Sequence, residues 1–353
     1  MTTNYNILCC DGGGIRGLLT AMLLDQLPQS ILTNTTVFAG TSTGGIISIA
    51  LAAGLQPSQL VTLYSSQCSA IFNTADSPAA SYEQIKGYLT NLMGSDWSWV
   101  ADGIALASEA GVLPKNLFAA KYNNTSLVSQ LQSTLGEQAS TLFSQLSQKL
   151  FVTTYQLDNG SGQWLPISID NLSSSSNDST LLDAALATSA APTFFPPYNH
   201  PQLGYCIDGG TFANNPSMFV LSRVLQAGVS ASSIRMLSLG TGATQNSVPS
   251  SYFGSIDPNL WGTYQYMFPL NAPSSVPSEL LINLMMDGSS DIDDEQSGRI
   301  LPPANYVRVE VPLTQAITLD DCSQVPALQT MADNFMQGDT WTSIVDWVTG
   351  NFV

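Results

Sequence analysis

A glycine-rich turn between two apolar segments constrains the fold of this chain more than any other feature. The sequence CCDGGGIRG, residues 9–17, follows the apolar run YNILCC and precedes LLTAMLLDQL, whose apolar residues recur at helical spacing. The pattern predicts a buried strand, a glycine loop and a helix. The backbone N–H groups of such a loop point toward a negative group. That group is either a bound phosphate or the oxyanion formed when a nucleophile attacks a carbonyl.

Strand-like and helix-like segments alternate after this turn. The segments NTTVFAG, FVTTYQL, WLPISI, GYCIDGG and RMLSLGTG are predicted strands, and segments with helical spacing of apolar residues separate most of them. Such alternation predicts an α/β fold with a mostly parallel sheet covered by helices on both faces. The hydrophobic content of 44% is enough for a sizeable core. Because no internal repeat occurs, we expect one domain over residues 1–353.

The charge balance argues against two classes of partner. The chain has nine Lys and Arg residues against 26 Asp and Glu, a formal net charge of −17. Nucleic-acid binding needs clustered basic residues, and adsorption to an anionic membrane needs a polybasic patch. A zwitterionic or uncharged lipid surface stays compatible with this charge. No signal peptide and no apolar run of about 18 residues is visible, so we expect a cytoplasmic protein, at most peripherally bound to a membrane.

The cysteines and acidic residues do not predict a metal centre. The five cysteines are odd in number and show no C-x-x-C spacing, so we expect neither a disulfide framework nor a structural zinc site. The acidic segment DGSSDIDDEQSG, which begins at Asp287, lacks the glycine and the final carboxylate of an EF-hand loop. We expect it to be a solvated acidic loop. The sequence implies no metal and no cofactor.

A second glycine-flanked turn presents a candidate nucleophile. The segment GTSTGG, residues 40–45, matches the pattern G-x-S-x-G around Ser42. Its glycines let a strand turn sharply into a helix, which lifts the serine side chain clear of the sheet, and the helix start adds positive potential. A plain strand-to-helix turn would show the same letters. A serine hydroxyl also needs a base to become a nucleophile.

Two bases are available to this serine. The single histidine, His200, lies in the proline-rich segment FFPPYNHPQLGY and is expected to be a surface-loop residue. With Asp183 it completes the chain order of a Ser-Asp-His triad. Asp208 in CIDGG follows a predicted strand, where open α/β sheets place their chemistry. Asp-Gly-Gly is also typical of a β-turn. A partly desolvated carboxylate can nevertheless take the serine proton directly.

The glycine loop can serve a serine nucleophile whichever of the two bases activates it. If the first two strands are neighbours, the N–H groups of Gly12, Gly13 and Gly14 can face Ser42. Arg16 then braces the loop by bonding carbonyls, attracts an anionic substrate group, or faces solvent.

A dinucleotide site is the competing use of the same glycines, because they also match G-x-G-x-x-G. That site needs an acidic residue at the end of the second strand to hold the ribose. Ala39 and Gly40 stand there instead, which disfavours a nucleotide.

Three blocks occur together in a specific order: DGGGIRG, GTSTGG, and DGG preceded by ATSAAPTFFPP. With DGGTFANNP and LSLGTG they resemble the patatin-like phospholipase family over about residues 5–245. The resemblance implies a three-layer α/β/α sandwich and a Ser–Asp dyad that works without histidine or metal. It assigns Ser42 as nucleophile and Asp208 as base. It also makes Gly12, Gly13 and Gly14 the oxyanion loop, braced by Arg16.

The implied function is phospholipase A-type hydrolysis of phospholipid or related glycerolipid esters through an acyl-enzyme. Residues 246–353 carry no matching motif and are expected to pack on the motif-bearing part. Two segments rich in aromatic residues are more typical of ordinary core and loop packing, but their side chains could instead line an acyl cleft or touch a lipid surface. These side chains are Trp97, Trp99, Trp261, Tyr264, Tyr266 and Phe268. A non-catalytic lipid- or nucleotide-binding module on the same fold is the alternative outside enzymes. The oligomeric state is left open.

Overall fold

A single mixed sheet organises the molecule. The computed structural model describes residues 4–73, 80–110, 117–173, 178–243, 246–253, 259, 261–267, 272–273, 276 and 280–353. Within these ranges eight strands form the sheet. They are β1 (Tyr5–Cys10), β2 (Val37–Gly40), β3 (Lys149–Gln156), β4 (Leu165–Asp170), β5 (Tyr198–His200), β6 (Gly204–Asp208), β7 (Ile234–Leu239) and β8 (Tyr306–Val309).

The centre of the sheet is parallel and one side is antiparallel. The strand order is β5-β6-β3-β2-β1-β7-β8, and β4 pairs with β3. The pairs from β3 through β2, β1 and β7 to β8 are parallel. Strands β4 and β6 run antiparallel to β3, and β5 runs antiparallel to β6. The predicted mostly parallel sheet is therefore confirmed.

The register on β3 brings two strand ends together. Strand β2 ends with Gly40 opposite Val152, and β6 ends with Asp208 opposite Thr154. Because β4 occupies the other edge of β3, both strands must lie along the same edge. They approach from opposite directions and stop two β3 residues apart, about 7 Å along the strand.

Helices cover both faces of the sheet. They are α1 (Gly17–Gln26), α2 (Ser30–Asn34), α3 (Thr43–Ala52), α4 (Pro57–Ser66), α5 (Cys68–Ile71), α6 (Tyr82–Met93), α7 (Ser98–Glu109), α8 (Asn124–Leu135), α9 (Leu181–Thr188), α10 (Gly210–Ala213), α11 (Ser217–Gln226), α12 (Ser250–Phe253), α13 (Thr263–Met267), α14 (Leu280–Ile300), α15 (Val325–Met336) and α16 (Asp339–Asn351). In β1, Leu8 and Cys10 belong to the core under α1, α3, α4, α9 and α15, whereas Ile7 and Cys9 belong to the core under α11. This alternation produces the expected three-layer α/β/α sandwich.

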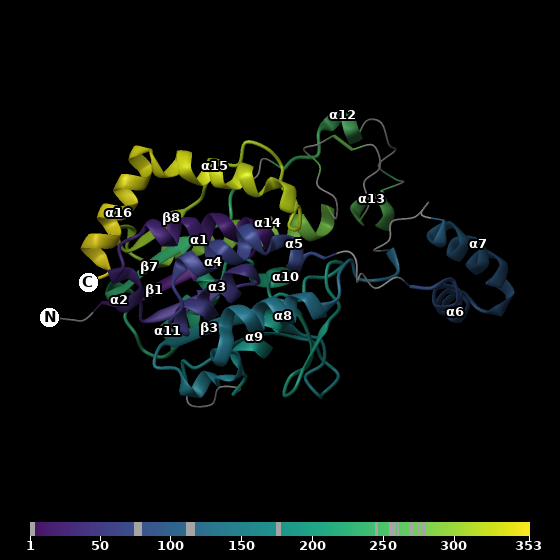
Figure 1. Cartoon of the computed structure of the whole chain (residues 1–353), viewed down its shortest axis with the longest axis horizontal. Coiled ribbons are helices and arrows are strands. Elements are labelled where there is room, and N and C mark those ends of the chain that lie inside the picture. The colour runs from purple at the N-terminus through teal and green to yellow at the C-terminus, as the bar shows by residue number, and fades with distance from the viewer. Residues whose placement is uncertain are drawn as a thin grey trace.

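The α6–α7 hairpin projects from one end of the body, at the far right of Figure 1. It has a small core of its own, formed by Ile85, Leu89, Ala101 and Ala105. At the other end, the C-terminal helices lie along the sandwich in yellow, and residues of α15 and α16 join the larger core. No helix among the described residues is long and apolar enough to cross a membrane.

Two sequence expectations are wrong. The acidic segment from Asp287 is not a loop, because it lies inside the 21-residue helix α14. That helix buries Met286 and Ser297 while most of its acidic side chains stay at least partly exposed, so its amphipathic packing outweighs the local acidity. A disulfide also joins Cys68 to Cys322 across 254 residues, with Cα atoms 5.8 Å apart. Spacing along the sequence cannot reveal a partner that distant.

Candidate active site

Ser42 occupies a sharp turn between β2 and α3. Its backbone has φ 54° and ψ −123°, and a positive φ is uncommon outside glycine. A Cβ on Gly44 would lie 2.0 Å from the Cys10 carbonyl oxygen, so only glycine fits behind the turn. The Ser42 N–H donates to Thr188 Oγ1 at 2.8 Å, which fixes the turn against α9. The backbone therefore holds the side chain in a strained, well-defined position.

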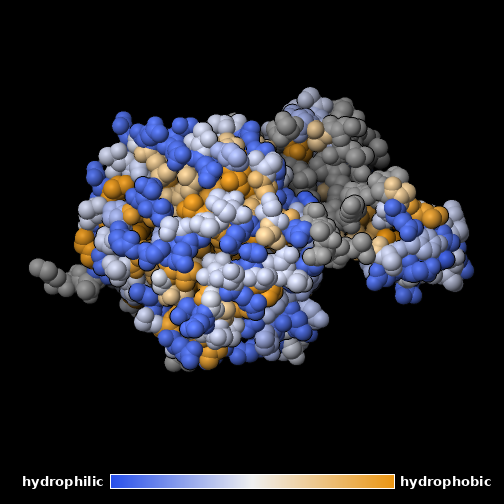
Figure 2. Space-filling view, in the orientation of Figure 1, coloured by the Kyte–Doolittle hydropathy of each residue, from blue (hydrophilic) through white to orange (hydrophobic). Residues whose placement is uncertain are grey.

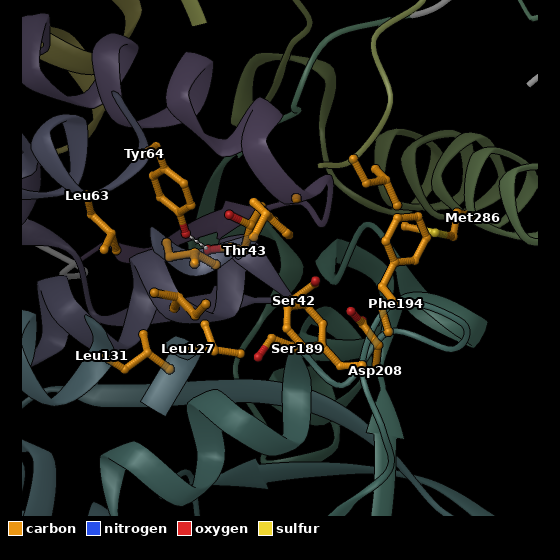
Figure 3. Close-up of a pocket in the computed structure, with 17 residues that line it drawn as sticks. Ser42, Thr43, Leu63, Tyr64, Leu127, Leu131, Ser189, Phe194, Asp208 and Met286 are labelled. Carbon is orange, nitrogen blue, oxygen red and sulfur yellow. Dashed lines mark hydrogen bonds between the residues drawn. The ribbon is translucent and has the colours of Figure 1, made fainter. Parts of the chain in front are cut away.

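Asp208 ends β6 beside this turn, and its carboxylate is buried. Oδ1 accepts the Gly210 N–H at 2.7 Å, whereas Oδ2 is buried without a donor among the described residues. Burial raises the pKa of Asp208 to about 7, opposed by the nearby Ser42 hydroxyl and the Gly210 N–H. Figure 3 shows the Ser42 and Asp208 oxygens pointing toward one another. The two residues of the candidate dyad thus lie side by side, and one carboxylate oxygen has no donor among the described residues. Catalytic hydrogen bonds of this kind often tighten only when substrate binds.

The glycine loop between β1 and α1 leaves two N–H groups available. The Gly12 N–H donates to the Asn214 carbonyl at 3.0 Å, and the Ile15 N–H donates to the Leu319 carbonyl at 2.8 Å. The N–H groups of Gly13 and Gly14 have no acceptor among the described residues. A Cβ on Gly12 would lie 3.2 Å from the Ser42 Cβ, so the loop packs directly on the serine turn. Gly13 and Gly14 are therefore the candidate oxyanion donors.

Arg16 is buried at the C-terminal end of this loop, with 7% of its surface exposed. Its Nε–H donates to the Gly13 carbonyl at 3.5 Å, a long contact that lies across the loop. Burial lowers the pKa of the guanidinium. Arg16 therefore lies against the loop that it was expected to brace, and the solvent-facing alternative is wrong.

A partly buried ion-pair network beside the loop was not anticipated from the sequence. Asp11 directly follows β1, and its Oδ2 accepts Arg308 Nη2 at 2.6 Å from β8. Arg308 also pairs with Glu310 and donates to Ser238 Oγ at 2.9 Å. The pattern YVRVEV alternates charged with apolar residues and could have indicated a strand with a charged edge, but nothing in it names Asp11 as the partner.

His200 is not a surface-loop residue, contrary to expectation. It lies in β5 with 1% of its surface exposed. Nε2 lies 2.7 Å from Ser179 Oγ, and Nδ1 accepts the N–H groups of Gln202 and Leu203. Both ring nitrogens are engaged away from Ser42, so the candidate Ser-Asp-His triad is not assembled here. Asp183 likewise accepts Tyr198 Oη and Thr180 Oγ1.

An apolar cavity opens from the Ser42–Asp208 pair. Figure 3 shows it running from these two side chains toward Leu63, Leu127 and Leu131. Phe194 and Phe195 line it as well. Tyr64 donates its hydroxyl to the Thr43 carbonyl at 3.2 Å and is a further residue of the cavity lining. The cavity is narrow, about 50 Å³. Hydrocarbon fits such a lining, because hardly any polar group in the cavity would be left without a partner.

Four of the aromatic residues singled out in the sequence, Trp97, Trp99, Trp261 and Tyr266, are not among the residues that line this cavity. Trp97 and Trp99 stack at the tip of the α6–α7 hairpin, with ring centroids 6.4 Å apart. Trp261 packs against Tyr252 and Tyr266 near α12 and α13. Phe268 lies outside the described residues, as does the side chain of Tyr264. Within the described ranges no group of three or more His, Cys, Asp or Glu residues is arranged to hold a metal ion.

Comparisons with known proteins show which family the chain resembles. The family model "Patatin-like phospholipase" matches residues 8–221, which contain the glycine loop, Ser42 and Asp208. A cGAMP-activated phospholipase of Vibrio cholerae is 28% identical over 288 residues, covering 74% of this chain and 72% of its own. Its Escherichia coli namesake is 27% identical and covers 67% of this chain and 61% of its own. Patatin-like protein 2 of Arabidopsis thaliana is 27% identical, and the match covers 86% of this chain and 75% of that protein.

Proposed function

This chain belongs to the patatin-like phospholipase family, and we propose that it is a lipid acyl hydrolase of phospholipase A type. One observation carries the proposal. The Ser42 hydroxyl faces the buried Asp208 carboxylate beside an apolar cavity, and one oxygen of that carboxylate has no donor among the described residues. The substrate class is the acyl esters of phospholipids or related glycerolipids.

The proposed reaction uses a Ser–Asp dyad. Asp208 Oδ2 accepts the Ser42 proton while the hydroxyl oxygen bonds to the ester carbonyl carbon. The N–H groups of Gly13 and Gly14 hold the oxyanion, Gly12 supplies the close packing against the serine, and Arg16 braces the loop. The C–O bond to the lysolipid then breaks, and Asp208 returns its proton to the leaving oxygen. Water repeats the route on the acyl-enzyme, with Asp208 now the base for the water.

We propose a zwitterionic lipid surface as the place where substrate is met. At the tip of the α6–α7 hairpin, Leu92, Trp97 and Trp99 are 69%, 54% and 69% exposed. Exposed tryptophans favour the membrane–water interface, and the net charge of −17 argues against anionic lipid. Figure 2 shows the hairpin as a protrusion that carries both apolar and polar surface.

The direct test is covalent labelling followed by product analysis. A fluorophosphonate probe should label the wild type and leave Ser42→Ala unlabelled, and mass spectrometry should find free fatty acid and lysolipid after incubation with mixed phospholipid vesicles. Because bacterial relatives are named cGAMP-activated phospholipases, the assay is run with and without cGAMP. An unlabelled wild type under both conditions would favour the non-catalytic binding module.

A second variant separates the dyad from the triad. His200→Ala should keep the turnover of the folded protein within a few-fold of wild type, because His200 contacts Ser179 and not Ser42. A triad would lose several decades of turnover. Since the substitution removes buried hydrogen bonds, turnover is normalised to the folded fraction measured by circular dichroism.

A further inference from the structure

A short segment from the C-terminal part of the chain presses on the glycine loop. The Leu319 carbonyl accepts the Ile15 N–H at 2.8 Å. A Cβ on Gly14 would lie 2.1 Å from the same carbonyl oxygen, and Gly14 has φ 56°. The Leu319 side chain also lines the apolar cavity. Residues 319–322, here called the strap, therefore touch both the candidate oxyanion donors and the substrate cavity.

Two anchors hold the strap in place. The first is Asp320, whose carboxylate is nearly buried, pairs with Lys121 and accepts the Tyr122 hydroxyl at 2.6 Å. The neighbouring backbone ties this anchor to the cavity wall, because the Tyr122 N–H donates to the Phe194 carbonyl at 2.7 Å. The second anchor is the disulfide from Cys322 to Cys68 in α5.

Both ends of the disulfide lie close to the cavity. Ile71, one turn after Cys68, lines the cavity, as does Leu319 three residues before Cys322. Cys9, Cys10 and Cys206 are buried free thiols, so Cys68–Cys322 is the disulfide that the described residues contain. The covalent bond thus clamps two walls of the cavity to each other beside the loop.

We propose that the strap is a positioning element for the oxyanion loop and that the Cys68–Cys322 disulfide fastens it, which makes turnover sensitive to thiol reductants. Oxyanion donors act only when they lie within hydrogen-bond distance of the developing charge. A strap that lifts away removes the acceptor of the Ile15 N–H and lets the Gly13–Gly14 backbone reorient. Turnover then falls, and substrate binding changes less than turnover because Leu319 is only one of the residues that line the cavity.

The chemistry of release is a thiol–disulfide exchange. A dithiol supplies two electrons and two protons, the S–S bond breaks, Cys68 and Cys322 become thiols, and the dithiol becomes its own disulfide. Reoxidation reverses each step. The inference rests on the proposed hydrolase function, since it is measured through turnover.

The experiment uses the full chain and a soluble ester, p-nitrophenyl butyrate, so that membrane binding does not enter. Treatment with dithiothreitol should lower kcat about tenfold, a fraction of the loss seen when an oxyanion donor is removed. KM should stay within twofold, and reoxidation should restore kcat. The Cys68→Ser/Cys322→Ser protein should match the reduced wild type and ignore dithiothreitol. The Cys206→Ser protein, which lacks a buried thiol elsewhere, should respond as the wild type does.

A second variant tests the strap even if the Cys68→Ser/Cys322→Ser protein does not fold. Asp320→Asn weakens the other anchor while the disulfide stays closed, and it should lower kcat with little change in KM. The inference is overturned if thiol titration shows an open disulfide while kcat is unchanged, or if kcat falls only together with loss of the near-ultraviolet circular dichroism signal. If no form of the protein hydrolyses ester or labels at Ser42, the proposed function itself fails.

Discussion

The pH dependence of serine acylation follows directly from the burial of Asp208. Its pKa is raised from 3.8 to about 7 because burial disfavours the charged carboxylate. Only the ionised form can accept the Ser42 proton. The reactivity of Ser42 should therefore rise as pH increases through about 7, and it should reach a plateau above pH 8.

The size of the effect can be worked from that pKa. With a midpoint near 7, roughly a tenth of the carboxylate is ionised at pH 6 and roughly nine tenths at pH 8, so acylation should speed up about tenfold. With an ordinary aspartate pKa of 3.8, the carboxylate would be fully ionised across this range and the rate would not change.

The assay is the second-order rate constant of fluorophosphonate labelling between pH 5 and 9, followed by intact mass. Asp11 and Asp293 also have pKa values raised to about 7, so the midpoint is assigned by substitution at Asp208 itself and at Asp293. Asp293→Asn should keep the wild-type midpoint. Asp208→Asn should label far more slowly and lose the inflection near pH 7. A flat wild-type profile from pH 5.5 to 8, or a midpoint that follows Asp293, would refute the reasoning.

Three further outcomes follow from the same coordinates. Asp208→Asn should raise the Tm by several degrees at pH 8 and hardly at pH 4. The reason is that the pKa of Asp208 is higher in the folded than in the unfolded protein, so ionising this carboxylate destabilises the fold. The cost reaches up to roughly 4 kcal/mol and builds up as pH rises from about 4 to 7. Leu131→Trp should fill the cavity and lower kcat/KM for dodecanoyl relative to butanoyl p-nitrophenyl ester at least tenfold. Trp97→Ala/Trp99→Ala should weaken sedimentation with phosphatidylcholine vesicles about fivefold or more and leave turnover of a soluble ester unchanged. The control is Trp164→Ala, which removes a tryptophan that is 72% exposed but lies outside the α6–α7 hairpin, and this variant should bind vesicles as the wild type does.

The parts of the site that could be predicted from sequence are those where the backbone itself demands a residue type. Gly44 lies too close to the Cys10 carbonyl for any side chain, and Gly14 needs a positive φ against the Leu319 carbonyl. Such requirements leave glycines at fixed spacing, which is readable without coordinates. Most of the sheet was readable as well: β1, for example, is buried on both faces and shows a continuous apolar run, whereas β5 and β8 were not predicted.

The parts that could not be predicted depend on partners distant in sequence. Arg308 meets Asp11 only because β8 joins the sheet next to β7, and Cys322 meets Cys68 only after the strap has packed. His200 was misjudged for the same reason. Its prolines suggested an exposed loop, but pairing of β5 with β6 buries the ring against Ser179. Local composition carries no information about such contacts.

The distance between the candidate nucleophile and its base is set by the sheet and not by the loops. Strands β2 and β6 end on the same edge of β3, opposite Val152 and Thr154, so the register of one strand fixes how far Ser42 stands from Asp208. The projecting α6–α7 hairpin, which lies between them in the sequence, can vary in length without moving either residue. A one-residue slip of β6 on β3 would instead shift Asp208 by about 3.3 Å and turn its side chain to the other face. Variation in this family should therefore be tolerated in the hairpin and be costly in β3.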